Sequence, residues 1–149
     1  MNPRAFFEKF QEILRNATES GSKVFHARAV MISPGPDPKE ALKRAPVPLA
    51  IIRPGASQCD PDADEEPDLI RQEFTVTLVT RRPSDAIGEE ALLEIFDLEE
   101  KLFQEAGILD SVSGVTIMSR AKSAAEMAQD PDYGYITWRD TAFEAWLTM

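Results

Sequence analysis

The stretch IRQEFTVTLVTRRPSDAIGEEALLEIFD, residues 70–97, decides the fold because it joins two different hydrophobic periodicities. In its first part every second side chain is apolar, with Phe74, Val76 and Leu78 on one face. This alternation, together with the β-branched residues in between, predicts a strand. An Arg-Arg-Pro turn then leads into the second part.

The second part has the periodicity of an amphipathic helix. Apolar residues recur at helical spacing, at Ile87, Ala91, Ile95, Leu98 and Leu102. The other face carries the acidic residues Glu89, Glu90, Glu94, Glu99 and Glu100. Those in the first turn are favoured by the positive end of the helix dipole. Gly107 is placed as a left-handed C-cap. We expect a core of strand against helix, formed by Phe74, Val76, Leu78, Ile95, Leu98 and Leu102.

Further elements are indicated on both sides of this stretch. Asn2 and Pro3 have the pattern of an N-cap and first helical position, and so do Asp37 and Pro38. The predicted elements are a helix over 3–17, a strand over 23–32, a short helix over 37–45, a strand from 47 to about 53, and two strands over 115–128 and 133–147. This order predicts one α+β domain over residues 1–149, with a mainly antiparallel sheet of about four to five strands and helices packed on one face.

The strand-to-helix turn has the outline of a phosphate site but lacks its chemistry. The segment TRRPSDAIGEEAL contains one glycine and no Lys-Ser or Lys-Thr pair, so neither a P-loop nor a dinucleotide-binding turn is present. Backbone amides at a helix N-terminus could still bind an anion, with Arg81 and Arg82 assisting. The clustered glutamates would repel a phosphate, however, so we expect no cofactor here.

The residue inventory also argues against catalysis and metal binding. His26 is the only histidine and Cys59 the only cysteine. A serine triad could therefore use only His26 as its base, and that residue lies in a predicted strand. One histidine and one cysteine cannot complete a tetrahedral zinc site. An acidic loop is predicted over about 54–69, and it opens like an EF-hand loop, but Glu65 replaces the turn glycine and Arg71 the bidentate glutamate. We therefore expect a protein that is not an enzyme, with no metal and no catalytic residue.

The charge is unevenly distributed along the chain. The net charge is −10, with +4 over residues 1–53 and −14 over residues 54–149. A sequence-reading nucleic-acid binder needs a basic footprint, which this chain lacks. The asymmetry suits packing against further copies, basic surface to acidic surface, although a merely solubilising acidic surface fits equally well.

No apolar run is long enough to span a bilayer and the first residues lack a signal-peptide core, so we expect no membrane contact and synthesis in a cytoplasm.

Several segments resemble the tail terminator proteins of tailed bacteriophages, the class of lambda's minor tail protein U, which also occurs in gene transfer agents. The segments are VPLAIIRPG, then EEPDLIRQEFTVTLVTRRPSDAIGEEALLEIFDLEEKL after an acidic loop, and finally YITWRDTAFEAWL. The order of elements agrees over roughly residues 3–147, and the pattern is most specific over residues 48–102.

This resemblance implies a structural virion protein of the tail or neck, assembled in the host cytoplasm. Such a subunit forms a ring, commonly a hexamer, that caps the tail tube, ends its polymerisation and joins the head connector, while DNA passes through the lumen unread. Its partners would be further copies, the tail-tube protein and the connector or stopper protein. We expect Asp62, Glu65 and Glu66 to contact the tube or a neighbouring subunit. Arg81 and Arg82 would form ion pairs with these acids across a ring interface.

Other functions remain open on the sequence alone. A head-completion or connector-stopper protein also forms a ring in the neck. A soluble α+β interaction module unrelated to phages has no need of a ring. Whether the acidic loop lines the lumen or meets a neighbour is also undecided.

Overall fold

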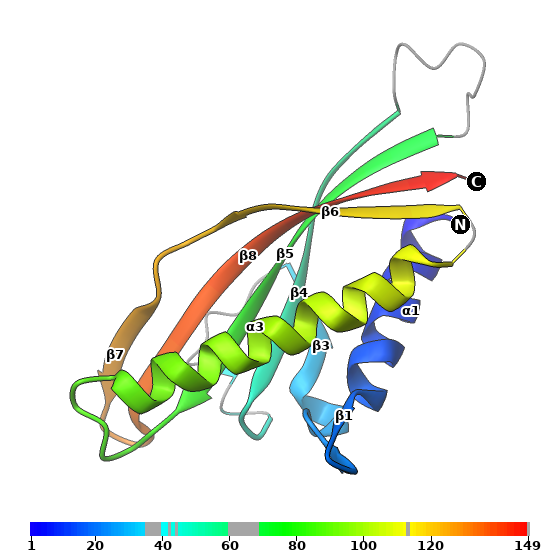
Figure 1. The fold of residues 1–149 in the computed structure, drawn as a ribbon. Helices are drawn as coiled ribbons and strands as arrows, with labels where there is room; N and C mark the ends of the chain where they lie inside the picture. Colours follow the sequence, from blue (N-terminus) through cyan, green and yellow to red (C-terminus); the bar gives the residue numbers. More distant parts are fainter. Residues whose placement is uncertain (35–39, 42, 44, 60–68, 113, 149) are drawn as a thin grey trace.

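The computed structural model describes residues 1–34, 40–41, 43, 45–59, 69–112 and 114–148 (Figure 1). In chain order the elements are α1 (Pro3–Asn16), β1 (Thr18–Glu19), β2 (Ser22–Lys23), the 3-10 helix η1 (Ala27–Ala29), β3 (Val30–Ile32), β4 (Leu49–Cys59), β5 (Leu69–Arg81), α3 (Glu89–Asp110), β6 (Val115–Lys122), β7 (Glu126–Asp130) and β8 (Gly134–Thr148). β1 and β2 form a small separate hairpin.

The main sheet has six strands in the order β3-β4-β5-β8-β6, with β7 also paired to β8. Only the β3–β4 pair is parallel. The long helix α3 crosses the sheet diagonally, and α1 lies beside its C-terminal half (Figure 1). The predicted α+β class with a mostly antiparallel sheet is therefore confirmed. The predicted strand over 115–128 is divided into β6 and β7, which accounts for the additional strand.

The main core lies between the helices and one face of the sheet. Its centre is Phe74 on β5, whose ring stacks on Phe143 of β8 with centroids 5.1 Å apart. The rings of Phe6 and Phe10 from α1 lie edge-on to Phe74 at 5.4 and 5.5 Å. All six side chains predicted for the core are buried, namely Phe74, Val76, Leu78, Ile95, Leu98 and Leu102. Edge-to-face and offset aromatic pairs add to the stabilisation that burial already provides.

A second, smaller cluster covers one end of the opposite face. It contains the buried residues Ala29, Ala41, Ala45, Leu49, Ile51, Val79 and Ile136. On β5 and β8 the residues of the two clusters follow the alternation of a strand, because successive side chains point to opposite faces. Val79 therefore packs in this cluster while its neighbour Leu78 packs under the helices.

The N-terminal helix begins as the sequence predicts. The side chain of Asn2 accepts a hydrogen bond from the Ala5 N–H at 2.8 Å, and Pro3 occupies the first helical position. Phe6, Phe10 and Leu14 are buried on one face of α1. The cap and the apolar stripe together explain why this segment is helical.

Two predicted boundaries are wrong, and a third prediction is not tested. Most of 23–32 is not a strand: the His26 Nδ1 accepts from the Arg28 N–H and begins η1, so that only Val30–Ile32 pairs with β4. Residues 54–59 continue β4 instead of opening the acidic loop, because β5 is long enough to pair with them past a bulge. The short helix predicted over 37–45 lies largely outside the described residues.

The ends of α3 also differ from the prediction. The helix begins at Glu89, so Ile87 precedes it and is 88% exposed. It continues through Gly107 to Asp110, since Leu109 is fully buried and anchors the last turn. Burial of an apolar side chain outweighs the cost of roughly 1 kcal/mol for a glycine within a helix.

We expect Phe74→Ala to lower the free energy of unfolding by about 3–5 kcal/mol, because it leaves a cavity at the meeting point of α1, β5 and β8. Urea denaturation followed by circular dichroism measures this change. Leu93→Ala is the control: Leu93 is 56% exposed, so its truncation should change stability by about 0.5 kcal/mol or less. Equal effects of the two substitutions would contradict the placement of Phe74 at the core.

Candidate assembly surfaces

The turn between β5 and α3 is held by its two arginines. The Nε and Nη2 of Arg82 lie 3.0 and 2.9 Å from Glu94 Oε2 on α3. The backbone N–H of Arg82 donates to the Tyr135 carbonyl at 3.0 Å. The guanidinium of Arg81 lies over the Tyr133 ring, 5.6 Å from its centroid. Arg82 therefore has a carboxylate partner within its own chain, and Arg81 is the more available of the two.

The N-terminus of α3 is occupied by a carboxylate of the same chain. The Gly88 N–H donates to Asp85 Oδ1 and the Ala91 N–H to Asp85 Oδ2, each at 3.0 Å. A phosphate at a helix N-terminus would bind these same amide groups. Asp85 thus acts as an internal anion at this position, and the turn is a structural one. An acidic residue just before an acidic first turn is the sequence signal that could have identified this cap.

The acidic residues predicted for the interface, Asp62, Glu65 and Glu66, lie outside the described residues. The predicted pairing of these acids with Arg81 and Arg82 stays a prediction. Arg81 stands at the end of the 13-residue strand β5.

A buried carboxylate ties α3 to the sheet. Glu99 is 4% exposed, and its Oε1 lies 3.2 Å from the Arg139 Nη1 of β8. The Lys122 Nζ of β6 lies 3.6 Å from Glu99 Oε2. The sequence-based assignment of Glu99 to the exposed face is therefore wrong. Its spacing of four from Ile95 and three from Leu102, both in the apolar stripe, is the signal for its burial.

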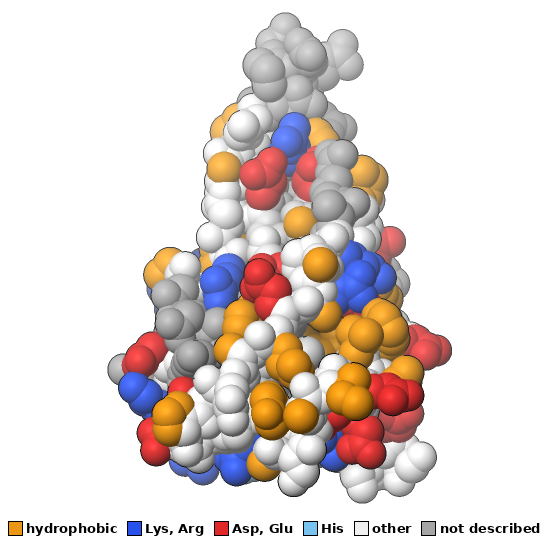
Figure 2. Space-filling model, turned by 90° about the vertical axis from the view of Figure 1, so that its left-hand side faces the viewer, with side chains coloured by type: hydrophobic (Ala, Val, Ile, Leu, Met, Phe, Trp, Pro, Cys, Tyr) orange, Lys and Arg blue, Asp and Glu red, His pale blue; other side chains and the backbone are white. Residues whose placement is uncertain are grey.

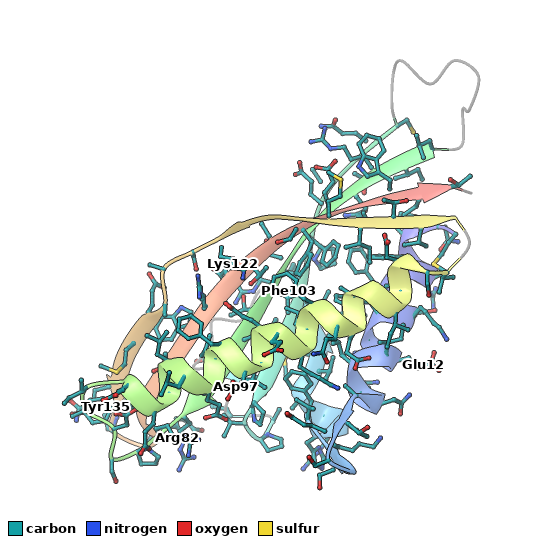
Figure 3. All side chains as sticks on the ribbon, viewed as in Figure 1. Glu12, Arg82, Asp97, Phe103, Lys122 and Tyr135 are labelled. Atoms are coloured by element: carbon teal, nitrogen blue, oxygen red, sulfur yellow. The ribbon has the colours of Figure 1, made fainter. Side chains whose placement is uncertain are left out.

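Aromatic rings flank this ion cluster on α3. The Lys122 Nζ lies 4.5 Å from the centroid of Phe103, and the Arg139 guanidinium lies 5.5 Å from that of Phe96. Figure 3 shows Phe103 pointing from α3 toward Lys122 on the edge of the sheet. A hollow of about 590 Å³ opens here, lined by Phe96, Glu99, Glu100, Phe103, Gln104 and Lys122. Glu99 and Lys122 are paired with each other, and Glu100 is exposed at the hollow.

Large apolar side chains are exposed near the start of α3 and on β7. The exposed fractions are 88% for Ile87, 56% for Leu93, 46% for Phe96 and 42% for Met127. The sulfur of Met127 lies over Gly88, so close that an added Cβ there would approach it to 2.9 Å. Figure 2 shows hydrophobic side chains gathered over the lower half of this face, with acidic groups beside them. Contiguous exposed apolar surface of this kind marks interaction sites.

Some backbone groups at both lateral edges of the sheet are occupied within the chain. On β6 the Ile117 N–H donates to Asp110 Oδ1 at 2.6 Å, and the Val115 N–H donates to the Val112 carbonyl at 3.2 Å. On β3 the Val30 carbonyl accepts from Gln11 Nε2 and Arg15 Nη2, at 3.0 and 3.1 Å. Occupied edge groups of this kind block pairing with another chain at those positions.

No model of a known protein family matches the sequence, and no curated protein matches it significantly. Among the residues that the structure describes, no cluster of three or more His, Cys, Asp or Glu side chains could hold a metal ion. The helices within these described ranges are too short or too polar to cross a membrane. Cys59 is exposed at the end of β4.

We expect Asp85→Ala to destabilise the fold by about 1 kcal/mol, and by at most about 2, because the Ala91 N–H of α3 loses its acceptor and the Gly88 N–H keeps only the Asp85 carbonyl. Thermal unfolding measures the loss. Ser84→Ala changes the neighbouring exposed residue and should leave the midpoint unchanged. If Asp85→Ala leaves the midpoint of thermal unfolding unchanged, the N-terminus of α3 is capped in another way.

We expect Glu99→Gln to lower the free energy of unfolding by about 1–3 kcal/mol, because Arg139 and Lys122 lose their buried counter-charge. Glu100→Gln removes the same charge from the exposed neighbour on the same helix and should have an effect of about 0.5 kcal/mol or less. Chemical denaturation of both variants tests this difference. Equal stability of the two would contradict the role of Glu99 as the link between helix and sheet.

Proposed function

We propose that this protein is a ring-forming subunit of a phage or gene-transfer-agent tail. In this proposal the ring, a hexamer by resemblance, caps the last ring of the tail tube and stops its polymerisation. The opposite side of the ring then joins the tail to the connector of the head. The protein acts through assembly and carries out no chemical reaction.

The observation that carries the proposal is the projecting hairpin of β4 and β5. These strands extend beyond the two helices (Figure 1), and residues Pro54–Cys59 of β4 are exposed throughout. The acidic segment 60–68 connects them, while Arg81 lies at the far end of β5. A hairpin that projects and is exposed in this way can contact a neighbouring subunit or the tail tube.

Two further features support the proposal. The strand and helix of residues 70–97, on which the resemblance mainly depends, form the centre of the fold with Phe74 at its middle. The net charge of −10 would let DNA move through a lumen without binding, since like charges repel. Both features are those expected of a terminator subunit.

The test is a tube-polymerisation assay with the tail-tube protein encoded beside this protein in its own genome. Tubes are grown with and without the purified protein and their lengths are measured by electron microscopy. We expect shorter tubes of uniform length, each with an additional ring at one end. If tube length does not change and no ring binds a tube end, the proposal is wrong. Binding to the head connector alone would instead indicate a stopper protein.

A further inference from the structure

One lateral edge of the subunit combines exposed apolar groups with acidic charge. We call this the acidic edge; it comprises Ile87, Leu93, Phe96 and Met127 together with the exposed carboxylates Glu89, Glu90 and Glu100. Asp97 is not part of it, because it lines a hollow together with Lys23 and Lys101. Residues 85–100 contain seven acidic residues and no basic one. The remaining three carboxylates of this segment are engaged within the chain, Asp85 as a cap and Glu94 and Glu99 in ion pairs.

The opposite lateral edge combines an exposed apolar group with basic charge. We call this the basic edge; it comprises Arg28 and Ile32. Ile32, at the end of β3, is 37% exposed. Arg28 is exposed in η1. Lys23 is not part of this edge, because it lines the same hollow as Asp97 of α3. Residues 1–32 contain five basic and three acidic residues.

The strand order places these two surfaces on opposite sides of the subunit. β7, which carries Met127, lies at one edge of the sheet, and β3, which ends at Ile32, lies at the other. In Figure 3 the labelled Tyr135 lies at the far left near the start of α3, whereas Glu12 lies at the right on α1. Two different surfaces on opposite sides of one subunit allow head-to-tail association, which closes into a ring when the rotation between neighbours permits it.

We infer that the acidic edge of one copy binds the basic edge of the next copy. This inference rests on the proposed ring and identifies the surfaces that build it. The contact buries Ile87, Leu93 and Phe96 against the surface around Ile32 and sets acidic groups opposite Arg28. A symmetric contact between two acidic edges is disfavoured, because like charges would face each other. Strand addition is blocked at the positions of β3 and β6 that Gln11, Arg15 and Asp110 occupy.

Two charge-reversing variants test the pairing. Glu90→Lys, Leu93→Lys and Glu100→Lys together make the acidic edge basic, and Arg28→Glu with Ile32→Glu makes the basic edge acidic. Each variant alone should associate at least about tenfold more weakly than the wild type, because its two edges then carry the same sign of charge. Sedimentation velocity over a range of concentrations measures the association, and circular dichroism confirms that each variant is folded.

The decisive experiment mixes the two variants in equal amounts. One of the two contacts in the mixture is then the wild-type pair of edges, and the other has both charges reversed. We expect the mixture to regain the sedimentation coefficient of the wild-type ring, with the two variants alternating around it. Ile108→Lys, on the same helix but outside the acidic edge, is the control and should assemble like the wild type; Ile108 is 53% exposed.

Three results would overturn the inference. They are a wild-type protein that does not self-associate at any concentration, variants that assemble as well as the wild type, and a mixture that remains unassembled although both variants are folded. The tube assay separates this inference from the proposed function. Rings that obey the mixing rule but leave tube length unchanged would refute only the terminator function. Tubes that are capped normally by both variants would refute only the edge-to-edge contact.

Discussion

The pairing of β5 with β8 is the interaction on which the rest of the structure depends. The two strands are antiparallel and remain in register from Leu69 opposite Thr148 to Arg81 opposite Ile136, without a bulge. Both are interior strands: β4 pairs with the free side of β5, and β6 and β7 share the free side of β8. Every other strand of the main sheet is therefore held directly or indirectly by this ladder. The stacking of Phe74 on Phe143 across it provides the surface on which α1 packs.

Because the helices cover one face of this sheet, the molecule presents different surfaces on its different sides. The main core lies entirely on the helical face, and the second cluster covers only one end of the other face. The lateral edges carry hydrogen bonds from Asp110, Gln11 and Arg15, so their backbones are not available at those positions for another strand. The exposed side chains differ in charge between the β7 edge and the β3 edge.

The strongest periodicities of the sequence were sufficient to predict the centre of the fold. Phe74, Val76 and Leu78 alternate in the strand, and Ile95, Leu98 and Leu102 form the helical stripe, so their burial followed from spacing alone. The local pattern failed where a distant partner decides the structure. Residues 54–59 have a loop-like composition but form a strand because β5 extends beside them. Gly107 resembles a helix end but stays helical because Leu109 is buried.

Polar side chains with structural roles were harder to predict than the core. Asp85 and Glu99 look like ordinary surface acids in an acidic chain, yet one caps α3 and the other is buried against Arg139. Glu99 and Arg139 are 40 positions apart in the sequence, and a local pattern does not predict a contact between residues so far apart. By itself the sequence determined the class of fold, the central strand and helix and the faces they bury, because periodicity is a local property of the chain. Only the tertiary structure decided which charges are paired internally and which remain at the edges, because ion pairs form between residues that folding brings together.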